Sequence, residues 1–144
     1  MAYMPPAKTD DWATPQDLFD EWNKRYQFTL DVAASSTNAK CPEWFGLDHP
    51  DPERRDGLKA HWYGNVWCNP PYGRQIRDWV LKAHIYQGTS VLLLPARTDT
   101  IWFHTYCYSS NRVTLRFLKG RVKYGDGKAP APFPSMMVVF NAKT

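Results

Sequence analysis

The stretch from residue 65 to residue 94 follows a strand, helix, strand pattern, and it restricts the fold more than any other part of the sequence. Residues 65–68 form a short apolar segment, residues 74–87 place apolar side chains at helical spacing, and residues 89–94 are almost wholly apolar. A strand that is apolar on both faces is typical of the centre of a parallel sheet covered by helices. Parallel neighbours need a crossover, which the intervening helix supplies before it closes at Gly88. The pattern therefore predicts an α/β fold.

The rest of the chain extends this pattern. The further predicted elements are a helix over about 15–25, a strand over 28–31, an irregular stretch over 44–58, a helix over 98–109, and strands over 113–118 and 136–140. Thr14 is the expected N-cap of the first helix, with Pro15 at its first position. Ile101, Trp102 and Tyr106 are available for one face of the helix over 98–109. Because the last two strands are neighbours, we expect an antiparallel edge strand on a mostly parallel sheet.

The length and polarity of the chain favour one soluble domain. Its 144 residues can enclose one sizeable core, so we predict a flexible arm over residues 1–10 and a single domain over residues 11–144. No apolar run approaches the ~18 residues of a membrane helix, and the first residues lack a signal core. The expected location is therefore the cytoplasm, where Cys41, Cys68 and Cys107 stay reduced.

Charge is distributed unevenly along the chain. Residues 1–70 hold 7 Lys/Arg and 11 Asp/Glu, a balance of −4, whereas residues 71–144 hold 11 and 3, a balance of +8. This asymmetry favours a basic face that binds a polyanion, although chance clustering on a solvated surface gives the same numbers. Arg97, Arg121 and Lys123 are the candidate DNA-phosphate ligands, and the alternative for Arg97 is an ion pair with Asp99 or another acid.

The segment Asn69-Pro70-Pro71-Tyr72 directly follows the apolar strand at 65–68. Two consecutive prolines fix φ twice, remove two backbone donors and bias Asn69 away from the helical region, so the turn is stiff. An amide and an aromatic ring are thus held beyond a strand end, where α/β sheets bind ligands. Asp31 and Asp56 are expected at or near two further strand ends, although an isolated segment of this kind is also compatible with an ordinary proline-rich turn.

A series of short motifs resembles the phage-type DNA N6-adenine methyltransferase (Dam-like) family over about residues 12–141. The matching segments are Trp12-Ala13-Thr14-Pro15, Leu30-Asp31-Val32-Ala33-Ala34-Ser35, Asp56-Gly57-Leu58, Asn69-Pro70-Pro71-Tyr72-Gly73, Leu94-Pro95-Ala96-Arg97-Thr98-Asp99-Thr100 and Gly120-Arg121. Each motif is weak by itself, and their order and spacing make the resemblance specific. It implies a Rossmann-like class I methyltransferase fold with helices on both faces of the sheet, and S-adenosylmethionine as the cofactor.

The resemblance also implies the chemistry and the site residues. A target adenine in double-stranded DNA is flipped from the duplex, Asn69 and the Pro70 carbonyl accept from its N6 amine, and Tyr72 stacks on its ring. The catalytic residues are then Asn69, Pro70, Pro71 and Tyr72. The cofactor-binding residues are Thr14, Pro15, Asp31, Ala33, Ala34, Asp56, Leu58 and Asn69. Direct methyl transfer needs neither a covalent enzyme intermediate nor a metal.

The chain departs from the wider methyltransferase pattern in three respects. Small residues replace the glycine-rich motif, the acid for the ribose is undecided among Glu43, Asp48 and Asp51, and a separate target-recognition domain is missing. Specificity must then come from loops such as residues 120–134, or from a second copy of the chain in a homodimer. If the gene is phage-encoded, the protein acts in the cytoplasm of a bacterial host.

Three other functions remain open from the sequence. They are a methyltransferase for RNA, a methyltransferase for a protein glutamine side chain, and a DNA-binding module without catalysis. The four scattered histidines do not suggest a zinc site. Cys68 precedes the proline-rich turn and is expected to be a buried strand residue, whereas residues 125–128 are expected to form a hairpin turn.

Overall fold

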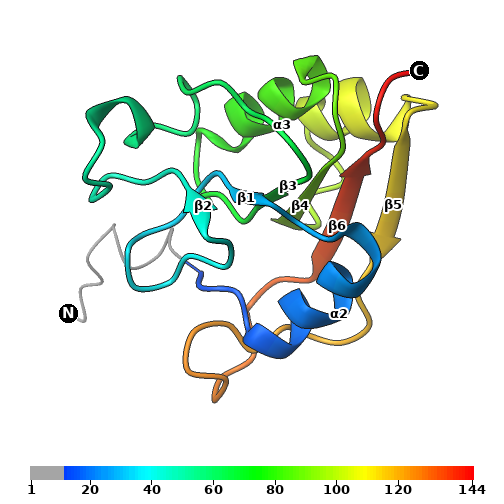
Figure 1. The fold of residues 1–144 in the computed structure, drawn as a ribbon. Helices are drawn as coiled ribbons and strands as arrows, with labels where there is room; N and C mark the ends of the chain where they lie inside the picture. Colours follow the sequence, from blue (N-terminus) through cyan, green and yellow to red (C-terminus); the bar gives the residue numbers. More distant parts are fainter. Residues whose placement is uncertain (1–11) are drawn as a thin grey trace.

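The computed structural model describes residues 12–144, so the predicted arm over residues 1–10 lies outside the described residues. The elements in chain order are α2 (Gln16–Tyr26), β1 (Leu30–Asp31), β2 (Glu43–Trp44), η1 (Pro52–Arg54), β3 (Val66–Cys68), α3 (Ile76–Ile85), β4 (Ser90–Pro95), η2 (Phe103–Tyr108), β5 (Val113–Phe117) and β6 (Ser135–Phe140). Figure 1 shows them arranged around one mixed sheet. The predicted α/β class is confirmed.

The six-stranded sheet has the order β2-β1-β3-β4-β6-β5. Strands β1 to β4 are mutually parallel, and β6 runs antiparallel to both β4 and β5. The expected antiparallel edge is confirmed, because the edge strand β5 pairs antiparallel with β6. The strand that runs opposite to β1–β4 is β6, and it lies inside the sheet between β4 and β5. The physical reason is burial: every residue of β6 is buried, so β6 needs neighbours on both sides, whereas β5 is mostly exposed.

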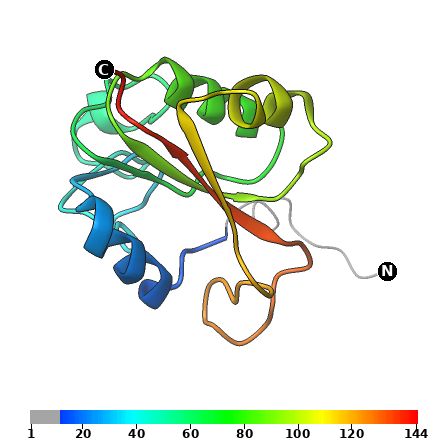
Figure 2. The same ribbon diagram turned by 90° about the vertical axis from the view of Figure 1, so that its right-hand side faces the viewer.

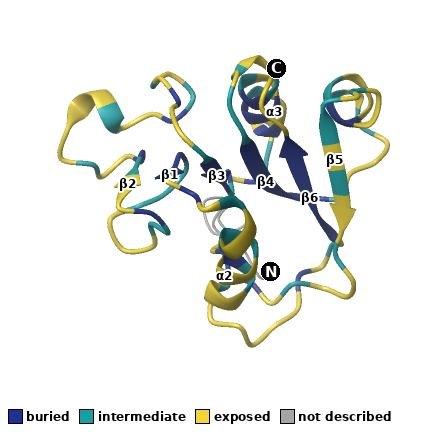
Figure 3. Ribbon diagram, turned by 45° about the vertical axis from the view of Figure 1, so that its right-hand side comes forward, coloured by how far each residue is buried: buried dark blue, intermediate teal, exposed yellow. Residues whose placement is uncertain are grey.

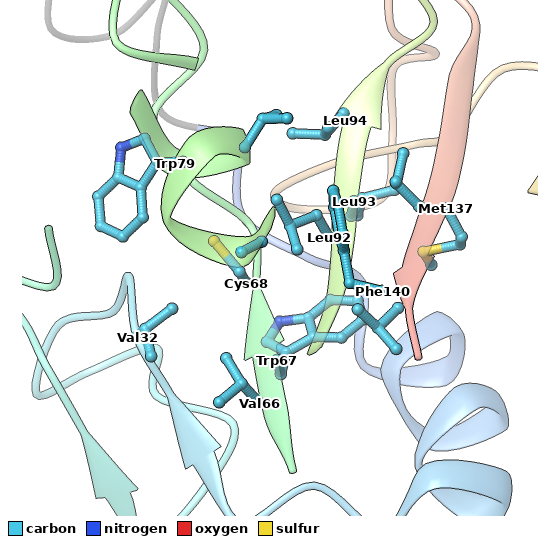
Figure 4. Close-up of a cluster of buried hydrophobic side chains, with 14 of the residues drawn as sticks. Val32, Val66, Trp67, Cys68, Trp79, Leu92, Leu93, Leu94, Met137 and Phe140 are labelled. Atoms are coloured by element: carbon cyan, nitrogen blue, oxygen red, sulfur yellow. The ribbon is translucent and has the colours of Figure 1, made fainter. Parts of the chain in front are cut away.

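Helices cover both faces of the sheet, as predicted. α3 and η2 lie on one face and α2 lies on the other (Figures 1 and 2). The core between these layers follows the central strands (Figure 3). Figure 4 shows buried side chains of the central strands, among them Trp67 of β3, Leu92 of β4 and Phe140 of β6, all at most 1% exposed. On the α2 side, Phe19 meets the Trp67 ring edge-on at 5.2 Å between centroids.

The start of the first helix differs from the prediction by one residue. α2 begins at Gln16, and its N-cap is Pro15, which makes no capping hydrogen bond with a side chain. Thr14 is not the N-cap because its buried hydroxyl accepts from the Asn69 amide instead. The C-cap of the helix is Gln27, which has a left-handed conformation with φ 50°. The Asn23 side chain accepts a hydrogen bond from the Phe28 N–H just beyond it.

Gly88 does not close the second predicted helix. α3 ends at Ile85, and Tyr86 continues in an extended conformation. The Arg112 guanidinium donates to carbonyls at the end of this helix and beyond it, among them His84 at 2.8 Å and Gly88 at 3.1 Å. The Arg112 side chain, which is distant in the sequence, therefore binds the free carbonyls at this helix end. A glycine cap was expected to do so.

The helix predicted over 98–109 packs against the core through Trp102 and Tyr106, as expected, and more deeply through two other residues. Its main part, η2, is a π-helix, and its buried side chains are Phe103 and Cys107. Ile101 is 85% exposed, so its assignment to the packed face is wrong. The wider π-helical spacing changes which side chains face the sheet. Within residues 12–144, no helix is long and apolar enough to cross a bilayer.

Candidate active site

A cavity of about 590 Å³ lies at the carboxyl ends of β1 and β3. Most of its lining comes from residues 12–14, 31–35, 45–48, 55–58 and 69–71. β1 and β3 are paired, with Asp31 opposite Trp67, so the residues that follow them meet at one edge of the sheet. Among the predicted cofactor-binding residues, Pro15 alone does not line the cavity; those that do are Thr14, Asp31, Ala33, Ala34, Asp56, Leu58 and Asn69.

Asp31 is a buried carboxylate at the edge of the cavity, with 3% of its surface exposed. One oxygen accepts from the Ala33 N–H at 3.3 Å and the other from the Lys40 N–H at 3.0 Å. Burial raises the Asp31 pKa to about 6, and the two backbone hydrogen bonds oppose this rise. Asp31 thereby fixes the loop after β1 and brings a titratable group to the cavity.

Two glycines allow backbone segments to approach closely behind the cavity wall. A Cβ on Gly57 would lie 1.9 Å from the Val32 carbonyl oxygen, and a Cβ on Gly46 would lie 1.8 Å from that of Ala34. Neither distance is possible for a real side chain. The close approach of these backbone segments therefore requires glycine at both positions.

Asp56 lines the cavity but is not at a strand end, which corrects the prediction. It follows η1 in a loop, and its side chain accepts from the Leu58 N–H at 2.9 Å. The strand expected before it forms earlier, as β2, which overlaps only the first residue of the stretch predicted to be irregular. Such a two-residue edge strand is too short to give a period-two signal in the sequence.

Among the three acids considered for the ribose, Asp48 lines the cavity and the other two do not. Asp48 accepts from both the backbone N–H and the hydroxyl of Ser36, and these bonds lower its pKa. Glu43 lies 3.8 Å from the Arg54 guanidinium, and Asp51 caps η1 through the Glu53 N–H. Sequence spacing did not separate these three acids because β2 was not anticipated.

Asn69 follows β3 directly and contacts the segment that precedes α2. Its Nδ2 donates to the Thr14 hydroxyl at 2.9 Å and also to the Trp12 carbonyl. Its Oδ1 is buried and has no hydrogen-bond partner within residues 12–144. A buried acceptor without a partner is costly, so this oxygen is suited to a donor that arrives with a ligand.

Tyr72 does not line the cavity. It is 2% exposed, its hydroxyl donates to the Leu93 carbonyl at 2.8 Å, and it lies 3.2 Å from the Tyr124 hydroxyl. Burial raises the Tyr72 pKa well above its usual range. The rings of Tyr124 and Phe133 meet Tyr72 edge-on, so its predicted stacking on a base requires these neighbours to move.

An aromatic cluster that sequence reasoning did not identify covers the Asn69 turn. Trp12 contacts the rings of Tyr124 and Phe133 edge-on at 5.7 and 5.1 Å, and the Gly125 N–H donates to the Ala13 carbonyl at 2.9 Å. The segment before α2 and the loop between β5 and β6 are thus joined above the turn at residues 69–72. The high aromatic content was the only signal, and it did not show which rings would meet.

A sequence model of the family described as "DNA N-6-adenine-methyltransferase (Dam)" matches residues 2–140. The chain belongs to this family. No curated protein matches the chain at a significant level. For this Dam-family protein the suspected resemblance is confirmed, and the match extends over nearly the whole sequence, including all the motifs on which the resemblance was based.

The three basic residues predicted to bind DNA lie outside the cavity lining of the Dam-family protein. Arg97 and Lys123 are exposed, and no ion pair joins Arg97 to Asp99 among the ion pairs of residues 12–144. Arg121 donates to the Ala131 carbonyl at 3.4 Å. Their DNA contacts stay predictions, and the alternative of an Arg97 to Asp99 ion pair is wrong.

Other groups in the Dam-family chain are placed as expected from their sequence context. Cys68 is fully buried in β3, and burial raises its pKa well above the usual range. The Lys128 N–H donates to the Asp126 side chain in a turn flanked by glycines with positive φ, as expected for residues 125–128. Among the described residues, no group of three or more His, Cys, Asp or Glu could hold a metal ion.

Proposed function

We propose that this protein transfers a methyl group from S-adenosylmethionine to N6 of adenine in DNA. The observation that carries the proposal is the Asn69 Oδ1 atom, a buried acceptor without a partner that belongs to a cavity-lining residue. An adenine amine is a donor of the kind this oxygen lacks. Family membership supports DNA adenine as the substrate.

The cavity fits the proposed cofactor in size and in the chemistry of its lining. A volume of about 590 Å³ suits a ligand of this class. Asp31 offers a carboxylate to the ammonium of the methionine part, and Asp48 and Asp56 offer acceptors to the ribose hydroxyls and the adenine amine. Phe45 and Leu58 supply apolar surface for the adenine ring. When bound, the cofactor supplies an electrophilic methyl group on a sulfonium.

The reaction requires Asn69 and Pro70 to accept hydrogen bonds from the target amine. These bonds pull the amine out of conjugation with its ring, so that its lone pair points toward the methyl group. The two prolines hold both acceptors in place, and alignment supplies much of the rate. Tyr72 would stack on the flipped base after Tyr124 and Phe133 move aside.

Access to Asn69 requires a local opening. The carbonyl of Trp12 and the hydroxyl of Thr14 bind the Asn69 amide, and Asn69 Oδ1 is shielded from solvent. We propose that DNA binding displaces the segment over residues 12–14 and the loop between β5 and β6. That loop is then also the part of the single catalytic domain best placed to read the target sequence, because it contacts the catalytic turn through Tyr124.

The test is Asn69→Ala, measured with radiolabelled cofactor and plasmid DNA, followed by nuclease digestion and base analysis. We expect kcat to fall by about two orders of magnitude or more, with a much smaller change in either KM, because the lost bonds act mainly in the transition state. Asn69→Asp should keep activity, since a carboxylate also accepts from the amine. The control is Asn111→Ala, an exposed asparagine in the turn before β5.

Wild-type rates in Asn69→Ala would reject the assignment of the active site. Label recovered in RNA or protein, with none in DNA, would reject the substrate while leaving the cofactor in place. Calorimetric binding of S-adenosylmethionine to the variant shows whether its cavity is intact. The three outcomes separate the catalytic residue, the substrate and the cofactor.

A further inference from the structure

A second cavity, of about 370 Å³, forms a groove between the carboxyl-terminal half of α2 and the β5–β6 part of the sheet. The helix contributes Trp22, Arg25 and Tyr26, and the sheet contributes Arg116 and Val139. α2 and β5 border this groove on the face of the sheet opposite to α3 (Figures 1 and 2). None of these residues lines the catalytic cavity.

The two arginines of this groove are unpaired. Within residues 12–144, neither Arg25 nor Arg116 makes a hydrogen bond or an ion pair, and Arg25 only lies over the Tyr26 ring at 5.6 Å. Glu21 is the single acid in the lining, and it forms no ion pair with either arginine although it lies one helical turn before Arg25. Two cations therefore share the groove without a counter-charge bound to them.

Other arginines of the chain show what pairing looks like in this fold. Arg112 donates to several backbone carbonyls, and Arg54 contacts Glu43, Asp51 and the Tyr63 hydroxyl. These cations serve the fold itself. Arg25 and Arg116 have no such internal partners, so their charges are available to a ligand.

Part of the groove lining is apolar. The Trp22 and Tyr26 rings stack with 7° between their planes, and Val139 also lines the groove. Cations beside apolar surface suit a chain of phosphates attached to sugars, which presents anionic and apolar surface together.

The groove is within reach of a duplex that occupies the active site. α2 has 11 residues and starts beside the cavity-lining segment 12–14, so its far end lies about 16 Å away, or roughly five base-pair steps. This distance is short enough for one duplex to span both sites.

We infer that the groove between α2 and β5 binds backbone phosphates of the DNA flanking the target base, through Arg25 and Arg116. This inference rests on the proposed DNA substrate. Because phosphate contacts carry no sequence information, the groove adds affinity and fixes the orientation of the duplex, while base recognition happens elsewhere. Its contribution is independent of the residues near the catalytic turn.

The experiment measures the affinity of the protein for duplex DNA of mixed sequence by fluorescence anisotropy over a range of salt concentrations. Each phosphate contact that is lost lowers the log–log salt slope by about 0.9, so Arg25→Gln/Arg116→Gln should lower it by about 2. Lys24→Gln is the matched control, because it removes an adjacent charge of α2 that does not line the groove. We expect this control to keep the wild-type slope.

A series of shorter duplexes locates the contact along the DNA. When the flank is cut to fewer base pairs than the groove requires, the wild-type slope should fall to that of the double variant. An unchanged salt slope in the double variant overturns the inference. A fall of the salt slope in Lys24→Gln as large as that in the double variant also overturns it, because it indicates a diffuse charge effect. The anisotropy experiment measures DNA binding and does not depend on methylation. Absence of methyl transfer would therefore reject the proposed function without changing the outcome of the binding test.

Discussion

Asp31 provides a quantitative test of how the cavity is built. Its carboxyl is 3% exposed, and burial raises its pKa from 3.8 to about 6. The rise corresponds to roughly 3 kcal/mol of preference for the neutral form in the folded protein. The folded state is thus penalised for holding this group ionised, although the Ala33 and Lys40 N–H groups reduce the penalty.

The sign of the pH effect follows from the direction of this pKa rise. Below pH 3.8 the carboxyl is protonated in both states, so it does not lower stability. Between pH 3.8 and about 6 the unfolded chain ionises first, and the free energy of unfolding falls with rising pH. Above about pH 6 the contribution is constant, at roughly 3 kcal/mol below its acid value.

The perturbation is Asp31→Asn, which removes the titration but keeps the shape. Urea unfolding of both proteins at a series of pH values gives the difference in stability, which cancels the other titrating groups. From pH 4 to pH 7 the wild type should lose roughly 2.4 kcal/mol relative to the variant. Asn offers one acceptor to two N–H donors, so the variant carries a constant offset that does not depend on pH.

Cofactor binding supplies the second readout for Asp31. If the carboxylate binds an ammonium, wild-type affinity for S-adenosylmethionine should rise with pH through about 6, and the affinity of Asp31→Asn should stay nearly flat. Calorimetry at constant ionic strength measures both. Parallel stability curves for the two proteins would refute the argument from burial, and parallel affinity curves would refute the role in binding.

Two further substitutions test the packing around the site. Gly57→Ala should destabilise the protein by about 1–3 kcal/mol and weaken cofactor binding, because the new Cβ would lie 1.9 Å from the Val32 oxygen and 2.8 Å from the Trp79 ring. Gly120→Ala is its control for the clash, because a Cβ there meets nothing within 4 Å and only the positive φ of 73° opposes alanine. Equal cofactor affinities in the two variants would contradict the argument. Tyr72→Phe should lower the free energy of urea unfolding by about 1 kcal/mol, since its hydroxyl donates to the buried Leu93 carbonyl; unchanged stability would show that this bond contributes nothing.

The sequence by itself determined the α/β class, most of the elements and the stiff turn at residues 69–72. These features depend on signals local to the chain: apolar runs of strand length, helical spacing of apolar residues, and two consecutive prolines. The edge of the sheet where Asp31 and Asn69 meet could also be predicted, because parallel strands place their carboxyl ends together. The family motifs then gave the cofactor-binding segments, which line the cavity in the structure apart from Pro15.

Only the tertiary structure decided the features that depend on contacts between distant residues. The place of β6 inside the sheet follows from covering its apolar residues on both sides, and no local pattern records which neighbours do so. Thr14 and Asn69 are far apart in the sequence, yet their hydrogen bond removed the predicted cap from α2. Tyr72 is buried because Tyr124 and Phe133 contact it from another loop. Its residue type predicted a ring that stacks on a base, whereas these contacts cover the ring in the structure.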